Sequence, residues 1–157
     1  MGFSLSFYPI DGGDLGDADR DGLAAFLDAR GLSVHSDGSG LFSADGAALS
    51  FDGARSDLAL DVLDQPEPVT GTLPHATLSS SECTFVFDLC TAGRLMIVNP
   101  QGDPTYLGIA GIHDGDDFPD PDDAVVVGSA AELALALEGG FERFQDYLQR
   151  VLNGNPG

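Results

Sequence analysis

Short runs of alternating apolar and polar residues dominate the first half of the chain. Residues 3–7 alternate strictly, and this period of two predicts a strand that Pro9 ends. Apolar runs between Asp–Gly turns and Pro-containing loops indicate further short strands. We expect these strands at 32–36, 40–43, 47–51, 58–63 and 70–78. The last should lie at a sheet edge, because Pro74 cannot donate a backbone hydrogen bond.

A helical period appears in the segment Asp17 to Arg30. Leu23, Phe26 and Leu27 fall on one face of the predicted helix. Its early Asp residues suit the positive end of the helix dipole, and an Arg–Gly pair suits its C-terminus. Gly22 weakens the prediction, because glycine costs about 1 kcal/mol relative to alanine inside a helix.

A second helix is predicted after a capping box. Ser79 provides an N-cap hydroxyl and Glu82 follows three residues later. This pattern predicts a helix over 80–92 that Gly93 closes. The run 84–87 is rich in β-prone residues, so a strand remains the alternative for this segment.

The last third of the chain returns to strands and then ends in helices. Strands are predicted at 95–98, 106–112 and 124–127. A second capping box at Ser129 and Glu132 predicts a helix to Glu138, and an apolar stripe predicts a last helix over 141–152. We see no repeat and no linker. Residues 1–157 are therefore predicted to form a single α+β domain with a mostly antiparallel sheet and three to four helices.

Charge narrows the choice of partners. The chain has 26 acidic and six basic residues, for a formal net charge of −20, and it contains no Lys. Such a surface repels nucleic-acid phosphates and anionic lipid, which excludes both as expected partners. A basic protein or cations are the ligands that this charge favours. The alternative is environmental: an acidic housekeeping domain of a salt-adapted organism would show the same excess, and missing Lys also suits a GC-rich genome.

The location of the protein is predicted from what the sequence lacks. It contains no apolar run of 18 residues and no recognisable signal peptide, so we expect a cytoplasmic protein. Cys83 and Cys90 are seven residues apart on the predicted helix, which separates their Cα atoms by about 10.5 Å. This separation is too large for a disulfide between them, so we predict reduced, buried thiols.

The densest charge in the chain lies at 113–123. Two interpretations of this run are possible. It is either a solvated loop or a docking surface for a basic protein partner, in which Phe118 provides an apolar anchor. Two prolines stiffen the run and would lower the entropy cost of binding. The residues that we predict to contact the partner are Asp114, Asp116, Asp117, Phe118, Asp120, Asp122 and Asp123.

A weaker candidate is a calcium loop formed by Asp17, Asp19, Asp21 and Asp28, with Gly22 at the sixth position. The pattern departs from a calcium loop in having a strand before it, an Ala at its eighth position and Asp instead of Glu at its twelfth. The competing interpretation is a helix with an acidic N-terminus and its last Asp on the solvent face.

No motif indicates catalysis or a cofactor. The three histidines, His35, His75 and His113, lie in different segments without partners at metal-ligand spacing. No nucleophile elbow or phosphate-binding loop is present. We therefore expect a protein that is not an enzyme, needs no cofactor and acts by binding.

Several patches of the chain have a recognisable pattern: 1–8, 45–51, 87–93, 95–102 with its Asn–Pro–Gln turn, and 125–141. In these patches the chain resembles small bacterial proteins, many of them uncharacterised, that occur among the immunity proteins of polymorphic toxin systems. The resemblance implies a protein that binds and neutralises a cognate toxin, and it implies no inhibitory residue. With the negative charge, it predicts that the toxin is basic and that the chain occludes its active or substrate-binding surface.

Overall fold

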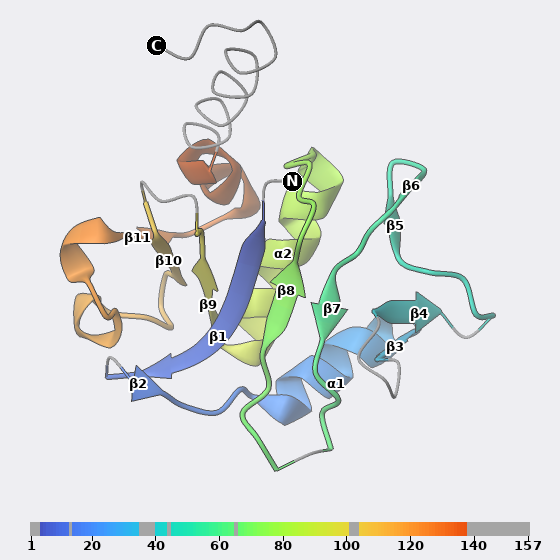
Figure 1. The fold of residues 1–157 in the computed structure, drawn as a ribbon, viewed down its shortest axis with the longest axis horizontal. Helices are drawn as coiled ribbons and strands as arrows, with labels where there is room; N and C mark the ends of the chain where they lie inside the picture. The colour runs from blue at the N-terminus through green and yellow to red at the C-terminus, as the bar shows by residue number, and fades with distance from the viewer. Residues whose placement is uncertain are drawn as a thin grey trace, which may run out of the picture.

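The computed structural model describes residues 4–12, 14–34, 40–43, 45–64, 66–100 and 104–137. Their fold is α+β, as predicted, with a mostly antiparallel sheet and three α-helical segments in the described part (Figure 1). The strands are β1 (Leu5–Asp11), β2 (Asp14–Leu15), β3 (Leu32–Val34), β4 (Leu41–Ser43), β5 (Ser50–Phe51), β6 (Ala54–Arg55), β7 (Ala59–Leu60), β8 (Gly71–Leu73), β9 (Leu95–Val98), β10 (Tyr106–Ile109) and β11 (Ala124–Val127). The helices are α1 (Arg20–Ala29), α2 (Ser80–Gly93) and residues 130–137, with short 3-10 turns η1 (Gly115–Asp117) and η2 (Pro121–Asp123).

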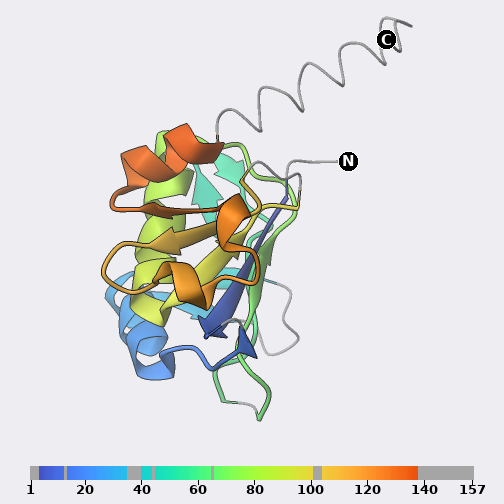
Figure 2. The same ribbon diagram turned by 90° about the vertical axis from the view of Figure 1, so that its left-hand side faces the viewer.

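The main sheet has the strand order β11-β10-β9-β1-β8-β7, and β2 pairs with the end of β1. Its neighbours are antiparallel except β10 and β11, which are parallel. Helices α1 and α2 lie on the same side of this sheet (Figure 2). The two short hairpins, β3–β4 and β5–β6, form separate two-stranded sheets.

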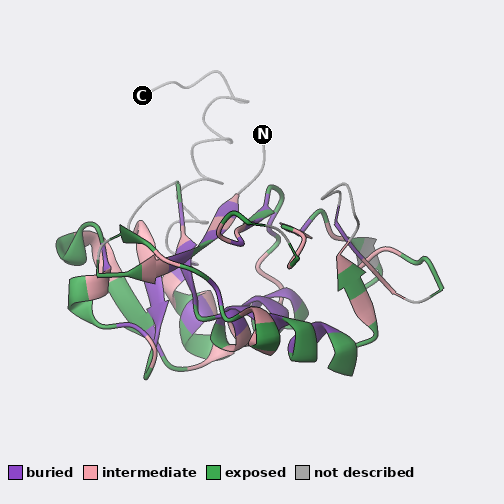
Figure 3. Ribbon diagram, turned by 90° about the horizontal axis from the view of Figure 1, so that it is seen from below, coloured by how far each residue is buried: buried purple, intermediate pink, exposed green. Residues whose placement is uncertain are grey.

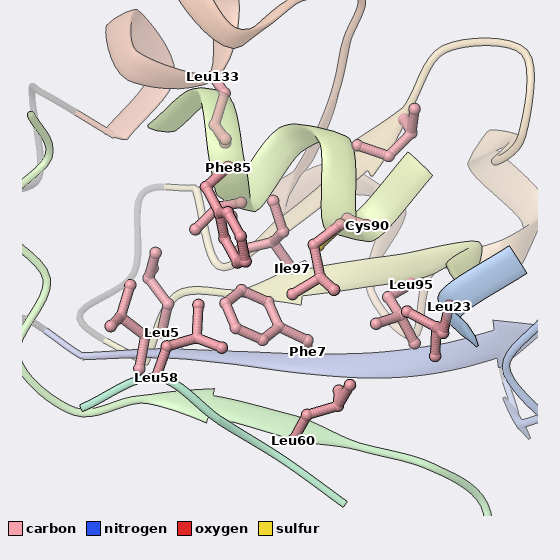
Figure 4. Packing of buried hydrophobic residues seen from close by; sticks show 14 of the residues in the cluster. Leu5, Phe7, Leu23, Leu58, Leu60, Phe85, Cys90, Leu95, Ile97 and Leu133 are labelled. Carbon is pink, nitrogen blue, oxygen red and sulfur yellow. The ribbon is translucent and has the colours of Figure 1, made fainter. Parts of the chain in front are cut away.

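The core lies between the sheet and the helices. Leu5 and Phe7 of β1 are buried, and Phe7 lies close to Ile97 of β9 and Phe85 of α2 (Figure 4). Buried residues gather where the helices meet the sheet, while the outer surfaces of the helices are exposed (Figure 3). The strict alternation that predicted the first strand therefore reflects one face that packs against helices.

Two predictions about proline positions were wrong. β1 does not end at Pro9 but continues to Asp11, with Pro9 opposite Leu95 of β9. A strand can pass through a proline wherever the ladder does not need its N–H, and the Pro9 carbonyl still accepts a hydrogen bond from Gly16 at 2.9 Å. The strand predicted over 70–78 is the short β8, which lies inside the sheet between β1 and β7; Pro74 follows its last residue and interrupts no ladder.

The capping signals located the helices correctly. The Ser79 hydroxyl accepts a hydrogen bond from the Glu82 N–H at 3.2 Å, and residues 80–93 are helical, which excludes the strand alternative. The buried Glu82 carboxylate accepts from the N–H groups of Thr77 and Leu78 at 2.9 and 3.0 Å. At the helix over residues 130–137, Ser129 accepts from the Glu132 N–H at 3.1 Å. Its predicted end at 138 and the helix predicted over 141–152 lie outside the described residues.

Helix α2 ends one residue later than predicted, for a packing reason. The left-handed residue is Arg94, with φ 56°, and Gly93 is the last helical residue. A Cβ on Gly93 would lie 2.7 Å from a methyl carbon of Leu23 in α1. Gly93 is therefore needed for close contact between the two helices and not for backbone freedom.

Both cysteines are buried, free thiols, as predicted. Burial raises the pKa of Cys83 to about 11 and also raises the pKa of the fully buried Cys90. Both thiols are therefore held in the poorly reactive, protonated form.

Across the described residues, we find no helix with the length and apolar character to cross a membrane.

Candidate functional site

The run 113–123, named the acidic segment below, connects β10 to β11 as an ordered chain with two 3-10 turns, η1 and η2. It lies on the near side of the molecule in Figure 2, coloured orange. Most of its residues are exposed. The segment thus combines the solvent exposure of a loop with a defined backbone conformation.

Three of the six carboxylates in the acidic segment fix its backbone. The Asp117 carboxylate accepts from the N–H groups of Asp114 and Gly12 at 2.8 and 3.1 Å. Asp123 accepts from the Thr105 N–H at 3.1 Å and from its hydroxyl. Asp120 accepts from the N–H of the second residue after it at 3.2 Å. The backbone N–H donors lower the pKa of Asp117 below the ordinary Asp value, because they stabilise the ionised form.

Phe118 lies inside the protein, so the prediction that it offers an apolar anchor to a partner was wrong. Only 4% of it is exposed. A Cβ on Gly108 of β10 would lie 2.5 Å from the Phe118 ring and 2.8 Å from the Cβ of His113. Gly108 therefore provides the space in which both side chains rest on the sheet. Phe118 anchors the acidic segment to its own sheet and not to a partner.

His113 is a buried histidine at the start of the acidic segment. Its Nδ1 accepts a hydrogen bond from the Ile109 N–H at 2.9 Å, so this nitrogen is unprotonated. Its Nε2 has no partner of acceptable hydrogen-bond geometry in the described structure, although the Arg94 carbonyl is close enough to favour protonation. Burial outweighs that carbonyl and the nearby Asp117, and the pKa of His113 is lowered.

A polar pocket of about 310 Å³ lies where the acidic segment meets the end of β1 and the start of β9. This pocket could not be predicted from the sequence, because the residues that line it belong to four separate segments of the chain. The lining residues are Ile10, Asp11, Asp17, Arg94, Ile112, His113 and Asp117.

Acidification should destabilise the protein through His113 before its carboxylates titrate. The folded-state pKa of His113 lies below its ordinary value of 6.5, so the unfolded chain binds this proton more readily. This contribution is complete above pH 6.5 and is lost as the pH falls toward the folded-state pKa, with a slope of at most about 1.4 kcal/mol per pH unit. Urea unfolding followed from about pH 7.5 to about pH 5.5 measures the slope above the usual carboxyl range.

The control for this prediction is His113→Asn, whose side-chain carbonyl can still accept from Ile109 but does not titrate. The Asn variant should have lower stability and a flatter pH profile than the natural chain. Equal slopes for the two proteins would show that His113 does not carry the effect.

Two carboxylates of the acidic segment have no partner among the described residues. Asp116 and Asp122 are exposed, and their carboxylates make no hydrogen bond or ion pair with the described part of the chain. Exposed apolar residues lie near them: Val125 is 38% exposed and Val126 is 45% exposed. Tyr8, 37% exposed, lies on the sheet face opposite the helices, because it alternates with the buried Phe7. Free charge and apolar surface thus occur together on this face at Val126 and Tyr8, whereas Val125 alternates with Val126 and points to the helix side.

The four Asp residues of the calcium-loop candidate do not converge. Asp19 caps α1 and accepts from the Gly22 N–H at 2.9 Å, and Asp17 forms an ion pair with Arg20 at 3.2 Å. Asp21 and Asp28 lie about two turns apart on α1. Within the described ranges, no group of three or more His, Cys, Asp or Glu side chains is arranged to hold a metal ion. The geometry is that of a helix with an acidic N-terminus.

Within the described ranges, His75 forms no cluster with these residues. His75 is exposed and contacts the Asp57 carboxylate on the surface, far along the chain from the acidic segment. His35 lies outside the described residues.

Comparisons of the chain with protein-family models, with curated proteins and with solved structures found no match. The immunity-type resemblance therefore remains a prediction from the sequence patches.

Proposed function

We propose that this chain is an immunity-type protein that binds a basic toxin through the acidic segment and occludes the toxin's active or substrate-binding surface. The observation that supports the proposal most is that the carboxylates of the segment have two different roles. Asp117, Asp120 and Asp123 hold its backbone, while Asp116 and Asp122 are exposed and have no partner among the described residues. The protein acts in the cytoplasm by binding and not by catalysis.

An ordered carboxylate array favours such a complex for two physical reasons. The segment is already held by its own hydrogen bonds, so binding costs less conformational entropy than the ordering of a flexible loop. Its charge also accelerates encounter with a positive surface, such as the phosphate-binding cleft of a nuclease. A stable interface buries roughly 1,600 Å² in total, about 800 Å² on each partner, so we expect residues beyond the two free carboxylates to take part. Val126 of β11 and Tyr8, which are exposed on the same sheet face, extend the surface.

Co-expression tests this function in cells. The product of the gene beside this one in its genome, where that product is basic and toxic, should stop growth alone and permit growth when this chain is present. The double variant Asp116→Asn/Asp122→Asn should lose protection, because it removes the two free carboxylates without touching those that hold the backbone. The matched control is Asp28→Asn/Asp64→Asn, which removes the same charge from two exposed positions elsewhere.

Protection by the control variant together with loss of protection by the segment variant supports the proposal. Equal protection by both variants would show that the acidic segment is not the contact surface. Failure of the natural chain to protect against any basic neighbouring product would contradict the immunity function itself.

A further inference from the structure

We infer that the outer edge of β11 binds an extended strand of the basic partner, so that the partner's chain adds to the sheet beside the acidic segment. This inference rests on the proposed function and specifies how the partner docks. Among the described strands, β11 pairs only with β10 and is the last strand of the main sheet. An edge of this kind presents backbone donors and acceptors in the spacing of a strand.

The register shows which backbone groups point outward. The Val127 carbonyl accepts from the Ala110 N–H at 2.9 Å, and Val127 is the register partner of Ile109. In a parallel ladder, a residue directs its N–H and its C=O to the same neighbouring strand, and the next residue directs both away. Val125 and Val127 therefore bond to β10, whereas Ala124 and Val126 direct their backbone groups away from it.

The side chains around this edge suit a basic strand. Val126 is 45% exposed and pairs with Gly108, so it lies on the same sheet face as the buried Phe118 and the acidic segment. β11 begins directly after Asp123, the last residue of that segment. A strand added along β11 would thus place its side chains beside Val126 and its basic groups within reach of the carboxylates of η2.

Charge selects the occupant of this edge. A second copy of the chain would bring another net charge of −20 to the same place, and repulsion between the copies opposes that pairing. Soluble proteins usually block an exposed edge with Lys, Pro or an inward-pointing charge, and the β11 sequence Ala–Val–Val–Val contains none of these. An extended segment of a basic protein satisfies both the free backbone groups and the charge.

Amide hydrogen exchange of the full chain tests the docking mode. The probe is a capped eight-residue peptide that alternates valine and lysine, at millimolar concentration. In the free protein, the amides of Ala124 and Val126 should exchange rapidly and those of Val125 and Val127 slowly. The peptide should slow exchange at Ala124 and Val126 by about tenfold or more and leave the other pair unchanged, because only outward N–H groups gain acceptors. The same peptide with alternate backbone nitrogens methylated, which blocks strand pairing, should have no such effect.

The other outcomes overturn the inference in distinguishable ways. Slow exchange at Ala124 and Val126 in the free protein would show that another part of the chain already covers the edge. Peptide-induced shifts confined to 114–122, without protection in β11, would place basic ligands on the carboxylates alone; the proposed function would stand and the strand-addition mode would fall. No response to the peptide anywhere would also contradict strand addition.

A proline substitution at the edge adds an independent test. Val126→Pro removes an N–H that no described strand uses, so the fold should be retained, whereas affinity for the valine–lysine peptide should fall about tenfold or more. Val126→Thr is the matched control, because it keeps the N–H and the β-branched shape. Unchanged affinity of a folded Val126→Pro protein would contradict the inference, and so would an equal loss in both variants.

Discussion

Replacing Phe118 with alanine should release the acidic segment from the sheet and lower the free energy of unfolding by about 3–5 kcal/mol, the range for removal of a buried aromatic ring. Phe118 is 4% exposed and fills the space over Gly108 next to His113, with ring centroids 6.4 Å apart. Without the ring, the carboxylates at Asp116 and Asp122 lose their fixed positions. Urea unfolding measures the stability, and amide chemical shifts over 114–123 report on the segment.

The conservative variant Phe118→Leu separates packing from any particular role of the aromatic ring. Leucine keeps much of the apolar volume and should cost less than about 1.5 kcal/mol, with the segment shifts close to those of the natural chain. Unchanged stability and unchanged segment shifts in Phe118→Ala would show that this side chain does not hold the segment.

Replacing Gly22 with alanine should destabilise the protein, although the same change inside an isolated helix stabilises it by about 1 kcal/mol. A Cβ on Gly22 would lie 2.2 Å from the Ala92 carbonyl oxygen, far inside van der Waals contact. The obstacle is backbone of α2, so the two helices must separate. That movement also breaks the hydrogen bond from the Asp19 N–H to the Gly93 carbonyl, which is 2.9 Å long. We expect a net loss of about 2 kcal/mol, within the range for overpacking.

The control for Gly22→Ala is Ala25→Gly, at an exposed position on the same helix. Ala25→Gly should cost about 1 kcal/mol through helix propensity alone. A stabilised Gly22→Ala protein, measured by urea unfolding under the same conditions, would contradict the close helix contact that the fold requires.

Local signals in the sequence were sufficient to predict much of the fold. The capping boxes at Ser79 and Ser129 act within four residues, so the starts of α2 and of the helix over residues 130–137 could be located from the sequence alone. Positions decided by contacts between distant segments could not. From the sequence alone, Pro9 predicts the end of a strand, but in the structure it pairs with Leu95 inside the strand. In the same way, Gly22 predicts only a weakened helix, because the close approach of α2 to this position cannot be predicted from the sequence.

The candidate site shows the same limit more sharply. The density of Asp at 113–123 identified the segment, but composition does not tell which carboxylates bind backbone and which face solvent. The burial of Phe118 depends on Gly108, ten residues earlier and on a strand. The polar pocket joins Asp11, Arg94 and His113, which no sequence pattern connects. Only the paired strands bring these residues together.

Association kinetics test most directly whether the free carboxylates of the acidic segment attract a positively charged macromolecule. Stopped-flow rates with the basic toxin should fall as ionic strength rises, because salt screens the attraction. At low salt, Asp116→Asn/Asp122→Asn should associate about tenfold more slowly than the natural chain, at the low end of electrostatic rate enhancement, and Asp28→Asn/Asp64→Asn should remain close to it. Association rates that do not change with ionic strength, or an equal decrease in rate for both variants, would contradict the account. The negative charge would then be distributed over the whole surface, and the acidic segment would not be the contact surface for a partner.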